Sequence, residues 1–423
     1  MIRNILLWAF LVLGIINFIQ IALYVIGANI YDIKQFKNSS KKHRRKGKSP
    51  LVSVIIPAYN ESLSIERCLD SIRRSTYRKF EIIVHNDHST DETAKIVRNY
   101  QKKYPKLNLR LINRQHNSGK AEGVNYSIKR WSKGDLIMTL DADCVIHRRA
   151  IKKAVDHFDD ETIAGVAANV KIMDHPSILG LLQKFEHLVG YRTKKFYTVA
   201  NCEFIVGGVA STYRREILDK VKFYDTDTQT EDIGLSMKII ANGNKKERII
   251  YASDVVAMTE PVYNFSALLK QRYRWKMGMI QNLIKYISLT GNLSGKYHKS
   301  LTLYRVPIAF ISEVNLLIEP FLIAYLLYLS IKYHTVALFL GAYLTISIIV
   351  FLAVWQDEHT KPLKKLKDSA YAPIIYFVFY IMNLVQVIAI LQVLVQPKKV
   401  FRKTAISSRW ISPARSGKTA KFA

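Results

Sequence analysis

Short β-branched runs alternate with amphipathic polar stretches from residue 51 to about residue 260. The predicted strands are residues 51–56, 81–85, 109–112 and 135–140, of which the last is apolar enough to be a buried central strand. We expect Pro57 to end the first strand, and the helical spacing of apolar residues predicts a helix over residues 62–74. The alternation predicts a βαβ domain with a largely parallel sheet, which binds ligands at the carboxyl ends of its strands.

Long apolar segments flank this domain on both sides. Residues 5–30 form a run longer than the apolar part of a cleaved signal peptide, so we expect an uncleaved membrane anchor. Residues 265–287 mix apolar with basic positions, as an amphipathic helix at a membrane interface does. Three later segments have the length of membrane spans, namely 303–331, 336–355 and 370–395. The predicted order is an anchor (1–31), a basic linker (32–50), an α/β domain (51–260), interfacial helices (261–300), membrane helices (301–396) and a basic tail (397–423).

The chain carries a formal net charge of +30, which attracts polyanions. A basic cluster follows the anchor directly and comprises Lys34, Lys37, Lys41, Lys42, Arg44, Arg45, Lys46 and Lys48. Beside an anchor, the expected partner of this cluster is the anionic surface of the lipid bilayer, and the positive-inside rule places the following domain in the cytoplasm. No base-stacking aromatic residues accompany the charge, so nucleic acid is not an expected partner. We therefore predict a multi-pass protein of the plasma membrane.

The number of predicted crossings conflicts with the charge of the tail. One anchor and three spans place the tail opposite the cytoplasmic domain, yet the tail is basic, with Lys398, Lys399, Arg402, Lys403, Arg409, Arg415 and Lys418. Either one apolar segment is re-entrant or interfacial, or the tail departs from the positive-inside tendency. The three cysteines, Cys68, Cys144 and Cys202, indicate no disulfide framework and fit a reducing compartment.

Polar clusters follow the predicted strands. Pro57, Tyr59 and Glu61 follow the first strand, and Asp87 follows the second, although such loops are also ordinary turn and cap chemistry. Asp141 and Asp143 stand at the end of the most hydrophobic strand, where the chain turns. Two carboxylates placed there can hold Mg²⁺ or Mn²⁺ together with a substrate diphosphate, and the ion would offset the charge on a departing nucleoside diphosphate.

Two later clusters supply candidate groups for a transfer reaction. An inverting transfer needs a carboxylate that deprotonates the acceptor hydroxyl, and Asp232 or Glu231 could do this, although both residues could equally begin a helix over 233–240. Gln271, Arg274 and Trp275 share one face of the interfacial helix. An amide, a guanidinium and an indole there suit a diphosphate and a sugar ring. Anchoring at lipid headgroups would explain Arg274 and Trp275 but not Gln271.

These four clusters, in this order and at these intervals, resemble the processive family 2 glycosyltransferases, which include cellulose, chitin, hyaluronan and poly-N-acetylglucosamine synthases. The resemblance is close over about residues 51–278 and looser in the membrane segments. It implies an α/β GT-A fold, a nucleotide-sugar-binding, Rossmann-like mixed sheet, in a cytosolic domain inserted between α-helical transmembrane segments. The family's D,D,D,QxxRW signature implies these roles: Asp87 contacts the nucleotide, Asp141 and Asp143 contact donor and metal, Asp232 is the base, and Gln271, Arg274 and Trp275 hold the donor diphosphate and the acceptor end.

The chain is most similar to bacterial poly-β-1,6-N-acetylglucosamine synthases within that family. They too have a segment like Asn117–Ala121 with a later Asn125, a short TED loop, and a tail like the one here with Trp410, Ser412, Pro413 and Arg415. By this resemblance Lys120 lies near the donor phosphates, and Gly207 and Gly208 precede the acceptor loop. Two departures leave the sugar and linkage open: His88 stands where glycine is usual, and Val206–Val209 replaces the more common Ser-Gly.

The resemblance implies an inverting hexosyltransferase that polymerises a β-linked polysaccharide, poly-N-acetylglucosamine, and threads it across the membrane. Its expected partners are UDP-N-acetylglucosamine as the UDP-sugar donor, a growing glycan acceptor, Mg²⁺ or Mn²⁺, the bilayer and a small membrane accessory subunit. Three alternatives stay open: a transferase that adds a single hexose to a lipid carrier, a synthase of another β-glycan, and a membrane-tethered module that binds acidic partners.

Overall fold

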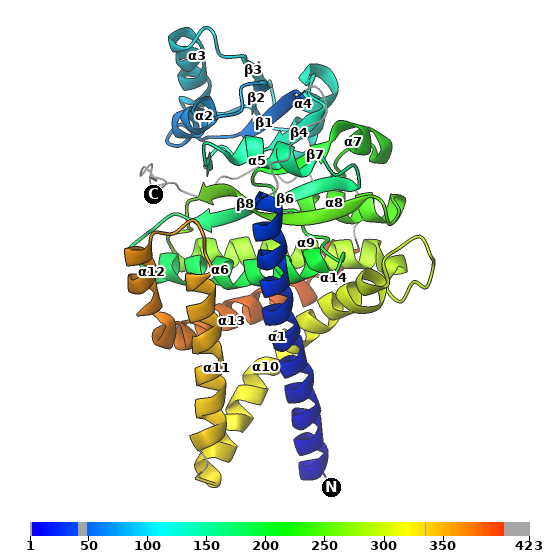
Figure 1. Ribbon diagram of the computed structural model, residues 1–423, viewed down its shortest axis with the longest axis vertical. Helices are drawn as coiled ribbons and strands as arrows, with labels where there is room; N and C mark the ends of the chain where they lie inside the picture. Colours follow the sequence, from blue (N-terminus) through cyan, green and yellow to red (C-terminus); the bar gives the residue numbers. More distant parts are fainter. Residues whose placement is uncertain (1, 41–48, 335, 402–423) are drawn as a thin grey trace.

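A mixed eight-stranded sheet forms the centre of the computed structural model, which describes residues 2–40, 49–334 and 336–401 (Figure 1). The strand order is β3-β2-β1-β4-β7-β6-β8-β5. The strands are β1 (Val52–Ala58), β2 (Phe80–Asn86), β3 (Leu109–Asn113), β4 (Leu136–Thr139), β5 (Val145–Ile146), β6 (Ile163–Ile172), β7 (Ser211–Arg214) and β8 (Arg248–Thr259). The first four are mutually parallel, whereas β7 runs antiparallel to both β4 and β6. The predicted strands are confirmed, and the sheet is mixed as the GT-A fold requires.

Helices cover both faces of this sheet. The helices of the domain are α2 (Ile65–Arg73), α3 (Thr93–Lys103), α4 (Lys120–Trp131), α5 (Ala150–His157), α6 (Ile178–Val199), α7 (Arg215–Val221) and α8 (Glu231–Asn242). Side chains of α2, α3 and α5 join one core cluster, and those of α4, α7 and α8 join the other. The long helix α6 has no counterpart in the sequence prediction.

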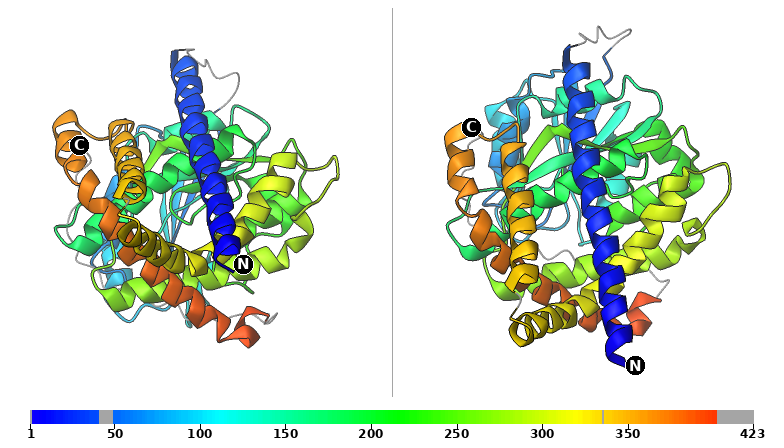
Figure 2. Two further views of the ribbon diagram at one scale, coloured as in Figure 1. Left: turned by 90° about the horizontal axis from the view of Figure 1, so that it is seen from below. Right: turned by 60° about the horizontal axis from the view of Figure 1, so that its bottom comes forward.

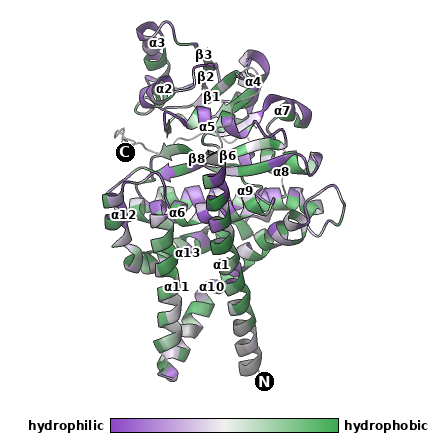
Figure 3. Ribbon diagram, viewed as in Figure 1, coloured by the Kyte–Doolittle hydropathy of each residue, from purple (hydrophilic) through white to green (hydrophobic). Residues whose placement is uncertain are grey.

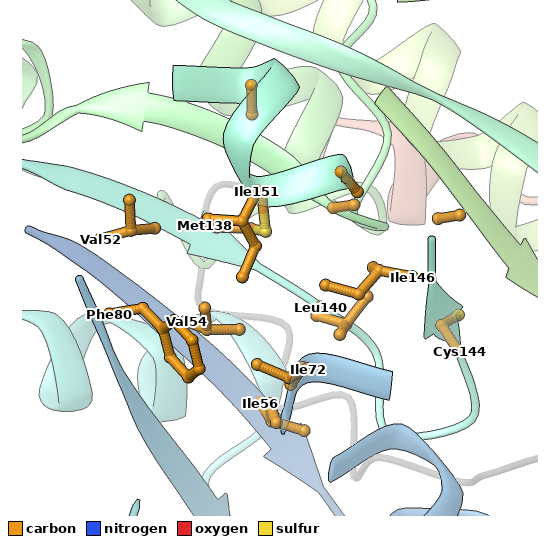
Figure 4. Packing of buried hydrophobic residues seen from close by; sticks show 14 of the residues in the cluster. Val52, Val54, Ile56, Ile72, Phe80, Met138, Leu140, Cys144, Ile146 and Ile151 are labelled. Atoms are coloured by element: carbon orange, nitrogen blue, oxygen red, sulfur yellow. The ribbon is translucent and has the colours of Figure 1, made fainter. Parts of the chain in front are cut away.

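The alternation of side chains along β1 explains why both faces are filled. Val52, Val54 and Ile56 point into one core, where they meet Met138 (Figure 4), and Ile55 points into the other. Each such side chain is fully buried, which stabilises the fold by roughly 1.5–3 kcal/mol relative to exposure. Pro57 does not end the strand as expected. It pairs in register with His85 and costs the ladder only one donor, because proline keeps its carbonyl.

A layer of helices lies beneath the sheet, and apolar helices extend from it. The second group comprises α1 (Ile2–Ser40), α9 (Phe265–Lys285), α10 (Val306–Lys332), α11 (Val336–Trp355), α12 (Pro362–Ser369), α13 (Ala372–Leu394) and α14 (Pro397–Val400). A 3₁₀ turn (Ile287–Leu289) and a π-helical turn (Ser300–Arg305) connect α9 to α10. In Figure 1, α6 and α9 lie directly under the sheet, while α1, α10 and α11 project downward from it. The described residues of α10 and α11 are largely hydrophobic (Figure 3).

Three helices of the described chain are long and apolar enough to cross a membrane: Gly14–Lys37, Ser300–Lys332 and Ala372–Leu394. A shorter apolar helix, Tyr343–Trp355, belongs to α11. These match the predicted anchor and the predicted later segments in position. Of the predicted basic groups, Lys41, Lys42, Arg44, Arg45, Lys46 and Lys48 lie outside the described residues, as do Arg402 to Lys418 of the tail with its tryptophan motif.

Candidate active site

Loops at the carboxyl ends of β1 and β2 are joined by hydrogen bonds. Asn60 has a positive φ of 55°, which turns the chain so that its Oδ1 accepts a bond from the Thr90 N–H at 2.8 Å. Glu61 is buried, and its Oε2 accepts a bond from the Ser64 hydroxyl at 2.6 Å. Pro57 lies within β1 and Tyr59 follows it, partly exposed. The first predicted cluster therefore forms the floor of this edge of the sheet.

Asp87 holds the loop that leads into α4. Its buried carboxylate accepts bonds from the Ser118 N–H at 2.9 Å and from the Gly119 N–H at 2.8 Å. Burial alone would raise the pKa of Asp87, but hydrogen bonds from His85, Ser118 and Gly119 lower it below its usual value. Gly119 has a φ of +87°, a conformation that favours glycine. Asp87 thus fixes the position from which Lys120 starts.

Lys120 lies at the centre of a charged cluster. Its Nζ is 2.6 Å from an Asp141 carboxylate oxygen and 3.4 Å from a Glu231 oxygen. Burial would lower the pKa of Lys120, but the negative charges of Asp141, Glu231 and Asp232 raise it, so the amine stays charged. A single cation therefore joins the DxD turn to the TED loop, residues 230–232.

The Asp232 carboxylate lies beside the same cluster and has a perturbed pKa. Burial, together with repulsion from Glu231, raises its pKa to about 6, and the positive charge of Lys120 opposes that rise. A carboxylate with this pKa can accept a proton near neutral pH. Glu231 and Asp232 are also the first two residues of α8, so the predicted helix start is confirmed.

Gly208 lines the same space. A Cβ built on it would lie 2.8 Å from Lys120 Nζ, 3.7 Å from Asp232 Oδ2 and 3.8 Å from Asp141 Oδ2. A side chain here would therefore enter the space between the two carboxylates and the amine. A Cβ on Gly207 would meet nothing within 4 Å, so only Gly208 of this pair closely approaches the cluster.

Asp141 and Asp143 can supply oxygen ligands for a cation. Ligand atoms of Asp141, Asp143 and Cys144 all lie within 4.8 Å of one another. Burial, followed by the charges of Asp143 and Asp141, raises the pKa of the Cys144 thiol well above its usual value. The thiol donates to Asp143 Oδ1 at 3.0 Å. Two carboxylates with open positions fit Mg²⁺ or Mn²⁺.

Helix α9 packs directly against the TED loop. A Cβ on Gly278 would lie 2.3 Å from Thr230 Oγ1 and 2.7 Å from Thr230 N, so only glycine fits there. One turn on, the buried Asn282 amide donates to Thr230 O and Thr230 Oγ1, each at 3.1 Å. Sequence analysis missed both residues. Their spacing could have revealed them, because Gly278 and Asn282 follow Trp275 by three and seven residues and so share its helix face with Gln271.

The predicted QxxRW side chains lie on that helix. Gln271 Oε1 is buried and has no hydrogen-bond partner, Arg274 is exposed, and Trp275 stacks under the Arg272 guanidinium at 4.2 Å. In the described part of the chain, neither Gln271 nor Arg274 is hydrogen-bonded to Asp141 or Asp232. The unpartnered Gln271 oxygen is a group that a ligand could satisfy.

Asp225 and Asp227 are not part of the site. Lys285 of α9 lies 2.8 Å from a carboxylate oxygen of each. Both aspartates therefore brace the loop that precedes residue 230 against α9.

A sheet of this order, with paired carboxylates at its carboxyl edge and a further carboxylate opposite, is that of a GT-A fold. Residues 53–222 match the model described as glycosyl transferase family 2. The chain is 31% identical over 237 residues to poly-β-1,6-N-acetyl-D-glucosamine synthase of Staphylococcus aureus, which covers 55% of this chain and 56% of that protein. It is 30% identical to the synthase of Staphylococcus epidermidis over the same share of each chain.

The chain spans about half the length of the curated relatives it matches. A solved structure, the mannosyltransferase PcManGT from Pyrobaculum calidifontis in complex with GDP-Man and Mn²⁺, has a similar fold, with a TM-score of 0.56 and 21% identity. That similarity covers 89% of this chain and 97% of the other.

Proposed function

We propose that this chain is a membrane-bound inverting glycosyltransferase that polymerises a β-linked polysaccharide, poly-N-acetylglucosamine, from UDP-N-acetylglucosamine. The observation that carries the proposal is the position of Asp232. Its carboxylate and that of Asp141 both lie within 4 Å of the Cβ position of Gly208, and Lys120 bridges Asp141 to the adjacent Glu231. A base and a donor-binding carboxylate on either side of one small space are what an inverting displacement needs.

In the proposed reaction the acceptor hydroxyl attacks the anomeric carbon of the donor sugar. Asp232 accepts the hydroxyl proton, the new glycosidic bond forms, and the bond to the diphosphate breaks with its electron pair leaving on UDP. Asp141 and Asp143 would hold Mg²⁺ or Mn²⁺, which supplies Lewis-acid stabilisation of the leaving diphosphate. Lys120 adds a positive charge on the same side, and Asp87 keeps Lys120 in place through Ser118 and Gly119.

The remaining predicted residues surround the donor and acceptor in this proposal. Pro57, Tyr59 and Glu61 form the nucleotide end, beside Asp87. Gln271 and Arg274 are assigned to the donor diphosphate, and Trp275, Gly207 and Gly208 to the acceptor end. The buried, unpartnered Gln271 oxygen supports a ligand on that face of α9. The catalytic domain is proposed to face the cytoplasm, where UDP-sugars are made available to it, at the plasma membrane.

The splayed membrane helices favour a second candidate function. In Figures 1 and 2, α1 projects apart from α10 and α11, and apolar side chains such as Phe18 and Phe321 are highly exposed. A polymerase that exports its product needs a path for the polymer through the membrane. A transferase that adds one hexose to a lipid carrier needs no such path, and the polymerase needs an accessory subunit or a second copy to complete one.

One experiment separates the two functions. Membranes that contain the protein are incubated with labelled UDP-N-acetylglucosamine and Mg²⁺ or Mn²⁺, with membranes of the Asp232→Asn variant as control. Polymer that β-1,6-specific glycosidase digests supports the main proposal. A lipid-extractable product with one added sugar supports the second, and transfer at the wild-type rate by Asp232→Asn contradicts the assigned base in both.

A further inference from the structure

Both ends of α13 are fastened to the catalytic side of the molecule. Just before its first turn, Asp368 of α12 accepts from Lys184 of α6 at 2.7 Å. Just after its last turn, Gln396 accepts from the Tyr273 hydroxyl of α9 at 3.3 Å, and the Lys399 carbonyl accepts from Gln281 of α9 at 3.0 Å. A helix that crosses a bilayer has its two ends on opposite sides. These ends instead contact two helices of the same layer.

The middle of α13 also packs on that layer. Met382 and Val385 join a buried cluster with Leu182 of α6 and Leu268 of α9. Ile375 joins a second cluster with Phe185 of α6. In Figure 1 α13 runs across the underside of the domain, whereas α1 and α11 run downward from it, and the views in Figure 2 agree.

The opposite side of α13 is an exposed apolar stripe. Its members recur at spacings of three, four and seven residues and are each 44% to 56% exposed: Ile374, Phe377, Ile381, Leu384, Leu391 and Leu394. A stripe of this spacing lies along one face of a helix, facing away from the domain. So continuous an exposed apolar stripe marks an interaction surface.

We propose that α13 lies in the plane of the cytoplasmic leaflet, with this stripe in lipid, and that only α1, α10 and α11 cross the bilayer. The occupant of the stripe is the bilayer, because the apolar helices α10 and α11 leave the domain on the same underside (Figure 3). The inference rests on the membrane placement in the proposed function, not on the reaction.

This arrangement removes the conflict between crossings and charge. In this topology the chain after α1 is cytoplasmic, α10 crosses to the outer face of the membrane, and α11 crosses back to the cytoplasmic face. The basic residues from Lys398 onward then stay on the cytoplasmic face, as the positive-inside rule expects.

The depth of single labels tests the orientation of α13. Phe377→Cys, Leu384→Cys and Leu391→Cys are labelled in the full chain, which is then reconstituted in vesicles of phosphatidylethanolamine and phosphatidylglycerol. The three native cysteines are buried, and the unsubstituted protein gives the background labelling. We expect the three depths to agree within about 5 Å, whereas a crossing helix would spread them over about 20 Å at 1.5 Å per residue. Leu340→Cys, Leu344→Cys and Ile348→Cys on α11 are the matched controls, with an expected spread of about 12 Å.

Sidedness provides an independent measurement. The turn between α10 and α11 and the start of α14 are both exposed, at His334 and Lys398. In sealed right-side-out vesicles we expect a membrane-impermeant maleimide to label His334→Cys but not Lys398→Cys, and the reverse in inverted vesicles. Labelling of both residues in right-side-out vesicles would mean that α13 crosses, and labelling of both in inverted vesicles would mean that α10 and α11 do not cross; either result would overturn the inference. A protein that does not sediment with vesicles at all would instead contradict the membrane placement itself.

Discussion

Gly278 offers the sharpest test of how the membrane-proximal helix positions the catalytic base. In Gly278→Ala the new methyl group would lie 2.3 Å from Thr230 Oγ1, 2.6 Å from Thr230 Cγ2 and 2.7 Å from Thr230 N. An ordinary contact begins near 3.4 Å, so the TED loop must withdraw by roughly 1 Å. It cannot do so by rotating a side chain, because one of the three atoms belongs to the backbone.

The expected effect on activity follows from that displacement. A shift of about 1 Å in a catalytic group costs on the order of 100-fold in rate. The effect on stability is smaller, because overpacking costs about 1–3 kcal/mol while alanine gains about 1 kcal/mol over glycine in a helix. We therefore expect a folded protein with a kcat lowered roughly 100-fold, measured as UDP release from purified membranes.

Gly190→Ala is the matched control. Gly190 lies in the interior of α6, and a Cβ there would meet nothing within 4 Å. This variant gains the same helix propensity without the clash, so its kcat is expected to stay within twofold of wild type. Wild-type kcat in Gly278→Ala would refute the reasoning that α9 sets the position of Asp232.

Three further predictions address the charges of the domain. Asp232→Asn should lower kcat about 100- to 10,000-fold. In the wild type, kcat/KM should fall tenfold per pH unit below about pH 6, because the base must be deprotonated. A flat pH profile of kcat/KM from pH 5 to 8 would contradict this assignment. Asp143→Asn should raise the Mn²⁺ concentration needed for half-maximal UDP release at least tenfold. Asp156→Asn, on the exposed side of α5, is the control. An unchanged Mn²⁺ concentration for half-maximal release in Asp143→Asn would remove Asp143 from the metal site. Burial would raise the pKa of Asp254, but hydrogen bonds and charges from His157 and Lys153 lower it to about 2. The lowered pKa stabilises the fold by about 2 kcal/mol above pH 4, and this stabilisation is lost as the pH falls through 2. Asp254→Asn should therefore lower the free energy of unfolding at pH 7 by up to that amount in urea titrations, and an unchanged midpoint would contradict the assignment.

The strands and the DxD turn were predictable from the sequence because their signals are local. The run that became β4 is apolar throughout, and Asp141 and Asp143 stand directly at its end. Pro57 was predicted wrongly for a physical reason: a parallel strand tolerates the loss of one N–H when its carbonyl still pairs.

Contacts between distant segments could not be read from composition. The ion pair from Lys120 to Glu231 joins residues 111 positions apart, and the fit of Gly278 against Thr230 depends on how α9 crosses the loop. The orientation of α13 was likewise hidden. Its length and hydropathy equal those of a span, and only the partners of Gln396 and Lys399 tell the two arrangements apart.

Gln281 of α9 is hydrogen-bonded on both sides, to the loop before the TED loop and to the segment after α13. Its Oε1 accepts from the Gln229 N–H at 2.9 Å, one residue before the TED loop, while its Nε2 donates to the Lys399 carbonyl at 3.0 Å. The Gln281 side chain therefore connects α14, which follows α13, to the loop that carries Asp232. If α13 rests on the leaflet, a displacement of α13 reaches the loop that carries Asp232 through this amide as well as through the packing of α13 on α9. In that arrangement the bilayer is one of the surfaces that hold this loop in place.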